Sequence, residues 1–295
     1  MNESAPIVSN ARVLKRFLLL SLLGWLALGA AAAETLTERT LRDIVERQKE
    51  LFARAEKEGE ALDEPHFVTE SKAIAAAYDI LIQKNPDYAP GYVAYGLFLG
   101  KIDMAKEAVA MLLKANKLDP HIPVVKNQLG KHLAEDGKPL DALPYFMSAM
   151  DLAPNEPLYH LNFARLLMEA REDFVSSGEW KRDALEKAML DAFQRAADLA
   201  AGDFAFAYQH AKAHYELDPP RWEETLRVWQ ALEARAPTTA ARQLVKLQQA
   251  NVLVQLDRLV DAQALLDQVT DLQLTAEKQP VLDALAAKKK AAAQP

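Results

Sequence analysis

Apolar residues recur every three or four positions along most of the chain, which is the pattern of helices that bury one face. In residues 38–58, Leu41, Ile44 and Val45 lie on the same side as Leu51 and Phe52, and charged residues fill the other side. The pattern therefore predicts an all-α protein.

Breaks at Gly, Pro and short polar runs divide this pattern into helices. Beyond the regular middle of the chain, helices are predicted over residues 38–58, 71–84, 203–217, 222–236, 239–256, 259–269 and 275–287. Residues 59–67, with Gly59 and Pro65, are predicted to form a loop. Residues 288–295 are predicted to be a frayed tail because they follow the last apolar face.

A period of 34 residues governs the middle of the chain. Pro86, Pro120 and Pro154 are separated by this spacing. Four further pairs share it: Gly96 and Gly130, Ala108 and Ala142, Leu112 and Phe146, Ala115 and Ala149. Small residues at fixed positions let helix backbones approach closely, and each proline ends a helix. The spacing predicts consecutive helix pairs that pack on one another.

These motifs resemble the tetratricopeptide repeat (TPR) family, with its consensus W-x-x-L-G-x-x-Y, A-x-x-x-F-x-x-A and a final P. One copy matches at Tyr92, Tyr95, Gly96, Leu99, Ala108, Leu112, Ala115 and Pro120. The next matches at Lys126, Leu129, Gly130, Leu133, Ala142, Phe146, Ala149 and Pro154. The resemblance implies an α-solenoid of antiparallel helix pairs, a TPR superhelix, with about five repeats and irregular ends.

The expected organisation follows from where the repeat is regular. Residues 34–70 are expected to be a capping helix and loop, and residues 71–200 the repeats. An insertion near residues 171–183 delays the second helix of the third copy, with a break expected at Ser176, Ser177 and Gly178. Residues 201–272 are expected to form degenerate helix pairs, and residues 273–295 a C-terminal capping helix and tail.

The N-terminal 33 residues have the pattern of a secretory signal. Arg12, Lys15 and Arg16 precede an apolar run that begins at Phe17, and Ala33 closes an A-x-A cleavage site. Cleavage would change the net charge from −7 to −9, because the segment contains three basic residues and one acid. We expect a periplasmic or secreted protein. An uncleaved inner-membrane anchor over residues 17–33 is the alternative, since 17 residues lie at the lower limit for a membrane span.

Composition narrows the classes of chemistry. With 52 Ala, 44 Leu and 10 Gly the chain favours helices, and without Cys it cannot form disulfides, thiol active sites or Cys-ligated metal centres. The acidic balance gives no global reason to bind nucleic acid. Contact with a membrane is expected only if the N-terminal segment is retained.

No catalytic constellation stands out, and no cofactor is expected. His210 and His214 are spaced i, i+4 and could hold a transition metal together with a carboxylate such as Glu216. A metal-dependent enzyme is therefore the alternative function. The Glu that follows the first His in metalloproteases is absent here.

The TPR resemblance implies a concave face, formed by the first helix of each pair, that binds extended peptides. The residues carried over to this face include Val93, Leu97, Asn127, Lys131, Arg165 and Met168. Asn162 lies next to them, and Tyr208 and Lys212 are expected to continue the strip. Val93 and Leu97 stand where a chaperone-binding member would have Lys and Asn. The cations and amides that follow favour an acidic or C-terminal peptide segment. The leading hypothesis is a non-catalytic exported scaffold, and the alternatives are the metal enzyme and a membrane-tethered assembly factor.

Overall fold

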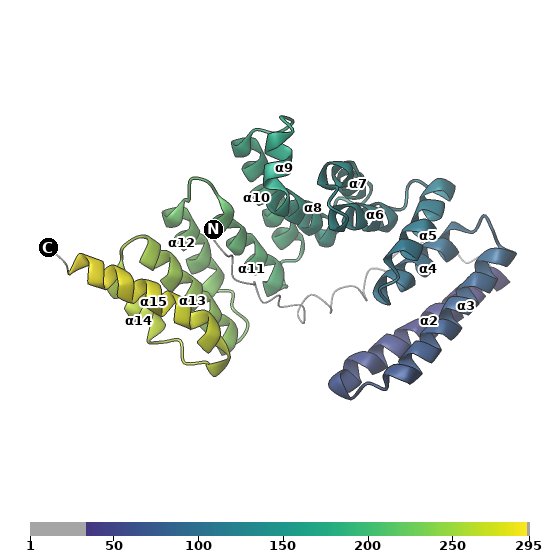
Figure 1. Cartoon of the computed structure of the whole chain (residues 1–295), viewed down its shortest axis with the longest axis horizontal. Helices are drawn as coiled ribbons and strands as arrows, with labels where there is room; N and C mark the ends of the chain where they lie inside the picture. Colours follow the sequence, from purple (N-terminus) through teal and green to yellow (C-terminus); the bar gives the residue numbers. More distant parts are fainter. Residues whose placement is uncertain (1–33, 294–295) are drawn as a thin grey trace. The chain divides into compact units, whose positions relative to one another are not determined.

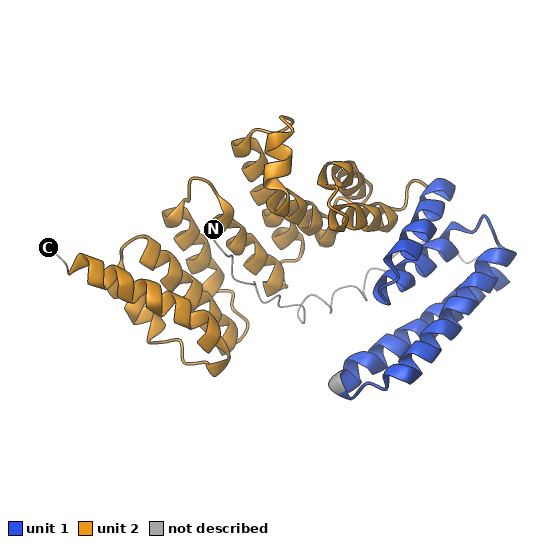
Figure 2. Ribbon diagram, viewed as in Figure 1, with its two compact units in different colours: residues 1–119 blue, residues 120–295 orange. Residues whose placement is uncertain are grey.

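The structure is a computed structural model that describes residues 34–293. Within this range every regular element is helical, and the chain divides into two compact units, residues 1–119 and 120–295 (Figure 2). The expected signal or anchor, residues 1–33, lies outside the described residues. None of the helices in the described range is both long and apolar enough to span a membrane.

Unit 1 begins with a hairpin of two long helices. It comprises α2 (Leu36–Glu58), the short turn η2 (Gly59–Ala61), α3 (Glu64–Lys84), α4 (Ala89–Lys101) and α5 (Ala105–Leu118). Thr35 and Glu38 form a reciprocal capping box at the start of α2. Inside the hairpin the Tyr78 hydroxyl donates a hydrogen bond to Gln48 Oε1 at 2.7 Å. The Tyr78 ring also stacks on Tyr95 of α4, so the hairpin caps the first repeat.

The predicted loop over residues 59–67 was wrong in its second half. Helix α3 begins at Glu64, not near Ser71, because the Asp63 carboxylate accepts a hydrogen bond from the His66 N–H at 3.0 Å. Pro65 lies in the first turn of α3, where a backbone N–H would have no acceptor within the helix, so the N–H that proline lacks is not missed. A proline taken as a loop signal is here part of a helix start.

Unit 2 continues the series of helix pairs (Figure 1). Its elements are α6 (Pro123–Glu135), α7 (Pro139–Leu152), α8 (Pro157–Glu169), α9 (Arg171–Ser176), α10 (Arg182–Leu199), α11 (Phe204–Ala213), η3 (His214–Glu216), α12 (Trp222–Glu233), α13 (Thr239–Gln255), α14 (Leu259–Leu266), η4 (Leu272–Leu274) and α15 (Thr275–Ala292). Neighbouring helices pair as α6 with α7, α8 with α10 and α13 with α14, while α11 packs mainly against α10 and α12 mainly against α13.

The 34-residue period corresponds to a repeated packing. Helices α3, α5 and α7 each end two residues before Pro86, Pro120 or Pro154. A Cβ atom on Gly96 would lie 2.9 Å from Leu112 Cγ, and one on Gly130 would lie 3.2 Å from the Phe146 ring. Ala108, Ala115, Ala142 and Ala149 are all fully buried. The expected close approach between the two helices of a pair is confirmed.

The turn between the helices of a pair also repeats. Asp103 and Gly137, which are 34 residues apart, have φ of 64° and 71°, and Asp257 has φ of 57° in the corresponding turn of the last pair. Gly and Asp tolerate this left-handed conformation better than most residues. The same backbone turn therefore joins α4 to α5, α6 to α7 and α13 to α14.

Three predicted helix ends were wrong in the C-terminal third. The first helix of the fourth pair, predicted over residues 203–217, ends at Ala213 and continues only as the single 3₁₀ turn η3. Helix α12 ends at Glu233 and α14 at Leu266, each three residues early. Leu217 and Val269 lie in the irregular segments that follow these helices, and their side chains are buried. They continue the apolar pattern of the sequence although the helix has already ended.

The tail over residues 288–292 is helical, not frayed as predicted. Helix α15 continues to Ala292, and the Lys288 ammonium donates to Asp257 Oδ1 at 2.8 Å. The Lys289 ammonium donates to Gln263 Oε1 at 2.9 Å. These contacts attach the end of α15 to the last helix pair. The charged, Ala-rich composition could not reveal them.

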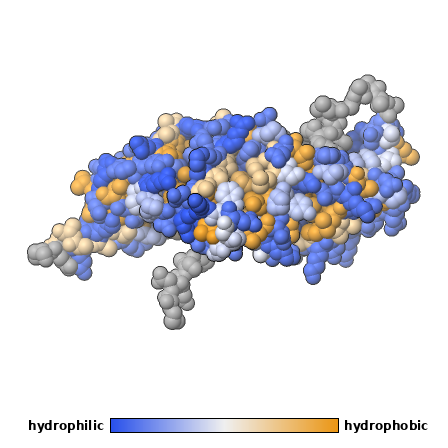
Figure 3. All heavy atoms as spheres, turned by 90° about the horizontal axis from the view of Figure 1, so that it is seen from above, coloured by the Kyte–Doolittle hydropathy of each residue, from blue (hydrophilic) through white to orange (hydrophobic). Residues whose placement is uncertain are grey.

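On the face drawn in Figure 3, apolar side chains appear among polar ones. The most exposed large apolar side chains of unit 2 are Val260 and Leu272. Isolated apolar residues of this kind are normal on a protein surface and identify no binding site.

Candidate functional site

An amide pair links the first helices of two consecutive repeats in unit 2. Asn162 on α8 donates from Nδ2 to Asn127 Oδ1 on α6 at 2.9 Å. Asn127 is only 1% exposed, whereas Asn162 is half-buried. Asn127 therefore positions Asn162, and only Asn162 is accessible for a partner.

Arg165 lies one turn after Asn162 on α8 and is half-buried. Burial lowers the pKa of its guanidinium, and the Glu169 carboxylate raises it by a smaller amount. No carboxylate among the described residues comes within ion-pair distance of Arg165. A partly desolvated cation that makes no close ion pair favours the binding of an anion.

Lys131 adds a second cation on α6. Its ammonium lies 3.5 Å from Glu135 Oε1, and both side chains are exposed. His132 Nδ1 lies 3.7 Å from the other oxygen of the same carboxylate. An exposed pair of this kind contributes little stability, so Lys131 can exchange Glu135 for another anion at low cost.

The remaining residues predicted for the concave face differ in accessibility. Val93 and Leu97 lie on α4 in unit 1, where Val93 is 6% exposed and Leu97 is half-buried. Tyr208 and Lys212 lie on α11. Lys212 is exposed, but the Tyr208 ring packs edge-on against Trp229 with centroids 5.2 Å apart. Burial, together with the Glu277 carboxylate, raises the pKa of Tyr208 to about 12. Its ring is therefore part of the packing between helices.

The comparisons with known proteins are consistent with this arrangement. No family model matches the sequence, and no curated protein does. Among solved structures, YrrB, described as a TPR protein with an unusual peptide-binding site, aligns with a TM-score of 0.55 at 19% identity, over 73% of this chain and 99% of its own. PilF of Pseudomonas aeruginosa aligns with a TM-score of 0.57 at 13% identity, over 84% of this chain and 98% of its own. PilW, described as a widely conserved type IV pilus biogenesis factor, aligns with a TM-score of 0.59 at 12% identity, over 85% and 100%.

The chain has the TPR fold. The sequence resemblance predicted this result from the period and the small residues. At 12–19% identity the likeness shows the fold alone, so any binding residue in this TPR chain must be argued from its own side chains.

The alternative metal site receives no third ligand in the structure. The His210 and His214 rings lie 5.1 Å apart, and His214 is only 3% exposed. Glu216, the carboxylate proposed to join them, instead accepts a hydrogen bond from Arg171 Nη2 at 3.1 Å. In the part of the chain that the structure describes, no three His, Cys, Asp or Glu side chains are grouped to hold a metal ion.

Sequence reasoning missed the aromatic core of the degenerate repeats. Tyr208 and Tyr215 both pack on Trp229, and Tyr215 also packs on Trp222. The Tyr215 hydroxyl lies 3.1 Å from both the backbone oxygen and Oε1 of Gln248 on α13. The sequence does contain a signal for this core, because the four aromatic residues follow one another at intervals of seven residues: Tyr208, Tyr215, Trp222 and Trp229.

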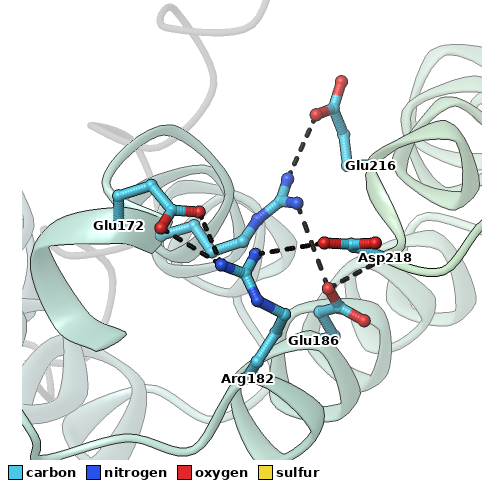
Figure 4. A network of polar contacts seen from close by, with 6 residues as sticks. Glu172, Arg182, Glu186, Glu216 and Asp218 are labelled. Atoms are coloured by element: carbon cyan, nitrogen blue, oxygen red, sulfur yellow. Dashed lines mark hydrogen bonds and ion pairs between the residues drawn. The ribbon is translucent and has the colours of Figure 1, made fainter. Parts of the chain in front are cut away.

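A charged network around the insertion was also missed. Glu186 of α10 is 2% exposed, accepts a hydrogen bond from the Asp218 N–H at 3.1 Å and lies 4.0 Å from Arg171 Nη1. Arg182 binds both oxygens of Glu172 on α9, at 2.9 and 3.1 Å (Figure 4). Its other nitrogen lies 4.0 Å from Asp218. The insertion is therefore held to the repeats by contacts between residues distant in sequence.

Proposed function

We propose that the chain is a non-catalytic, exported TPR scaffold that binds an acidic or C-terminal peptide segment of a partner protein. The first helices α6 and α8 would provide the surface for this segment. Arg165 is the observation that carries the proposal, because a half-buried guanidinium that makes no ion pair within residues 34–293 is a ready anchor for a carboxylate. Lys131 and Asn162 would contact the rest of the segment, by charge and by hydrogen bonds to its backbone.

The process proposed is assembly or secretion in the cell envelope. It is supported by the signal-like residues 1–33 and by the likeness of the fold to PilW, which is described as a pilus biogenesis factor. YrrB, a TPR protein described as having a peptide-binding site, supports the peptide as ligand class.

Charge reversal of the two cations tests the proposal. In a pull-down from the native envelope fraction, Lys131→Glu/Arg165→Glu is expected to retain less than about a tenth of the partner protein captured by the wild type. Two acidic side chains would then face the anionic segment in place of two cations.

The matched control is Arg227→Glu/Arg242→Glu, which makes the same change in net charge at exposed positions on α12 and α13. It is expected to capture the wild-type set. Equal capture by both double variants contradicts the proposed surface. Recovery of the chain from the cytoplasmic fraction alone contradicts export.

A further inference from the structure

Two histidines lie at the end of α11 and in the turn that follows it, and the more deeply buried one, His214, lacks a hydrogen-bond partner within the described residues. We call residues 210–218 the latch segment. His214 is 3% exposed, and neither of its ring nitrogens has a hydrogen-bond partner among the described residues. The His210 ring is half-buried and meets His214 edge-on, at 80° between ring planes. A positive charge on either ring would be desolvated and would face the other ring.

Charged groups from the neighbouring helices do not compensate for this burial. Asp198 of α10 faces His210, and Arg221 and Glu224 at the start of α12 face His214. Burial is the largest cause that lowers the pKa of both rings, and with His214 as its neighbour the pKa of His210 falls to about 4. The folded segment therefore holds both rings neutral at neutral pH.

The opposite side of the latch segment is held by the charged network. Glu216 binds Arg171, Asp218 lies near Arg182, and the Asp218 N–H donates to the buried Glu186 (Figure 4). The latch segment thus has a histidine side, where the His214 ring makes no hydrogen bond within the described residues, and a charged side that binds Arg171 and Glu186.

We propose that the latch segment is an acid-released element, which opens in mild acid because its two imidazoles can take up protons only by leaving their buried position. The sign follows from proton binding: the open segment binds protons below about pH 6.5, whereas in the closed segment His210 binds one only near pH 4 and His214 only below its ordinary pKa. The closed state is therefore fully stable above pH 6.5 and weakens as the pH falls through this window. Because Lys212 belongs to the latch segment, opening would also displace Lys212 from the predicted concave face.

Hydrogen exchange at pH 7 and pH 5 tests the proposal, after correction for intrinsic exchange rates. Relative to the amides of α8, the amides of residues 210–218 are expected to lose at least about tenfold in protection at pH 5. At pH 5, which is about 1.5 units below the ordinary pKa of histidine, protonation of one histidine in the open state can lower the protection by up to about 30-fold. Unchanged relative protection in the wild type overturns the proposal.

Two variants separate the histidines from general acid effects. His210→Gln/His214→Leu is expected to keep its protection at pH 5, since no imidazole remains to be protonated there. His66→Gln, at an exposed position on α3, is expected to behave as the wild type. Equal loss of protection in the double variant and the wild type overturns the proposal.

A direct titration covers the case in which the double variant does not fold. In the wild type, the imidazole NMR signals of His210 and His214 are expected to keep their neutral shifts until the segment opens, with midpoints below 6.5. Midpoints at 6.5 or above for both rings, with the segment still protected from exchange, overturn the proposal.

Discussion

Replacing Trp229 with Ala is expected to lower the free energy of unfolding of the C-terminal helix pairs by about 3–5 kcal/mol. Trp229 is fully buried on α12 and is the shared contact of Tyr208 and Tyr215, with ring centroids 5.2 and 6.0 Å away. Its removal leaves a large cavity between α11, α12 and α13. Because repeats depend mainly on their neighbours, the loss should be concentrated in residues 204–269.

Urea denaturation followed by circular dichroism measures the loss, and hydrogen exchange locates it. Trp229→Phe is the matched control, because its ring still packs against Tyr208 and leaves a much smaller cavity. We expect it to cost less than about half as much. Equal costs for the Ala and Phe variants, or a cost below about 1 kcal/mol for Ala, would show that Trp229 does not organise these pairs.

Gly96→Val is expected to destabilise unit 1 by about 2–3 kcal/mol. A Cβ atom at this position would lie 2.9 Å from Leu112 Cγ and 3.2 Å from the Ala108 carbonyl oxygen. The backbone oxygen cannot move away without bending α5, and Leu112 is itself buried. The two helices would therefore have to separate.

Gly100→Val on the same helix provides the control, since a Cβ there would meet only Ala108 Cβ at 3.9 Å. Thermal denaturation should show a much smaller effect for this variant. Adding Leu112→Ala to Gly96→Val should recover about 1 kcal/mol relative to the sum of the single effects, because the two sites share one contact. Additive costs, or equal costs at Gly96 and Gly100, would contradict close packing as the reason for the glycine.

The regular repeats could be predicted because the same contact between the two helices of a pair recurs in each repeat, at the same spacing along the sequence. Gly96 meets Leu112 and Gly130 meets Phe146, so local motifs already encode the packing of a pair. The start of α3 and the end of α15 could not be predicted in this way. A proline such as Pro65 occurs both in loops and in the first turn of a helix, and here the Asp63 carboxylate caps the start of α3. Lys288 could equally belong to a frayed tail, and here its bond to Asp257 holds the end of α15.

For the candidate site, the repeat register identified the helices but not the accessibility of each residue. Asn127 is buried because Asn162, 35 residues later, bonds to it, and Tyr208 is covered by Trp229. Such contacts depend on which side chain the next helix presents. That Arg165 makes no ion pair with a carboxylate of the described residues is likewise a property of the folded chain, and the sequence shows Arg165 only as one cation among many.

Site-specific photocrosslinking in the native host tests the binding surface most directly. A photoreactive residue at Met168, half-buried and one turn from Arg165 on α8, is compared with one at Met147, exposed on α7, a second helix. We predict that a partner protein is crosslinked through position 168 and not through position 147, and that Arg165→Glu abolishes the product. Crosslinking through position 147 alone, or a product at 168 that is unaffected by Arg165→Glu, would contradict a partner bound on the first helices through Arg165.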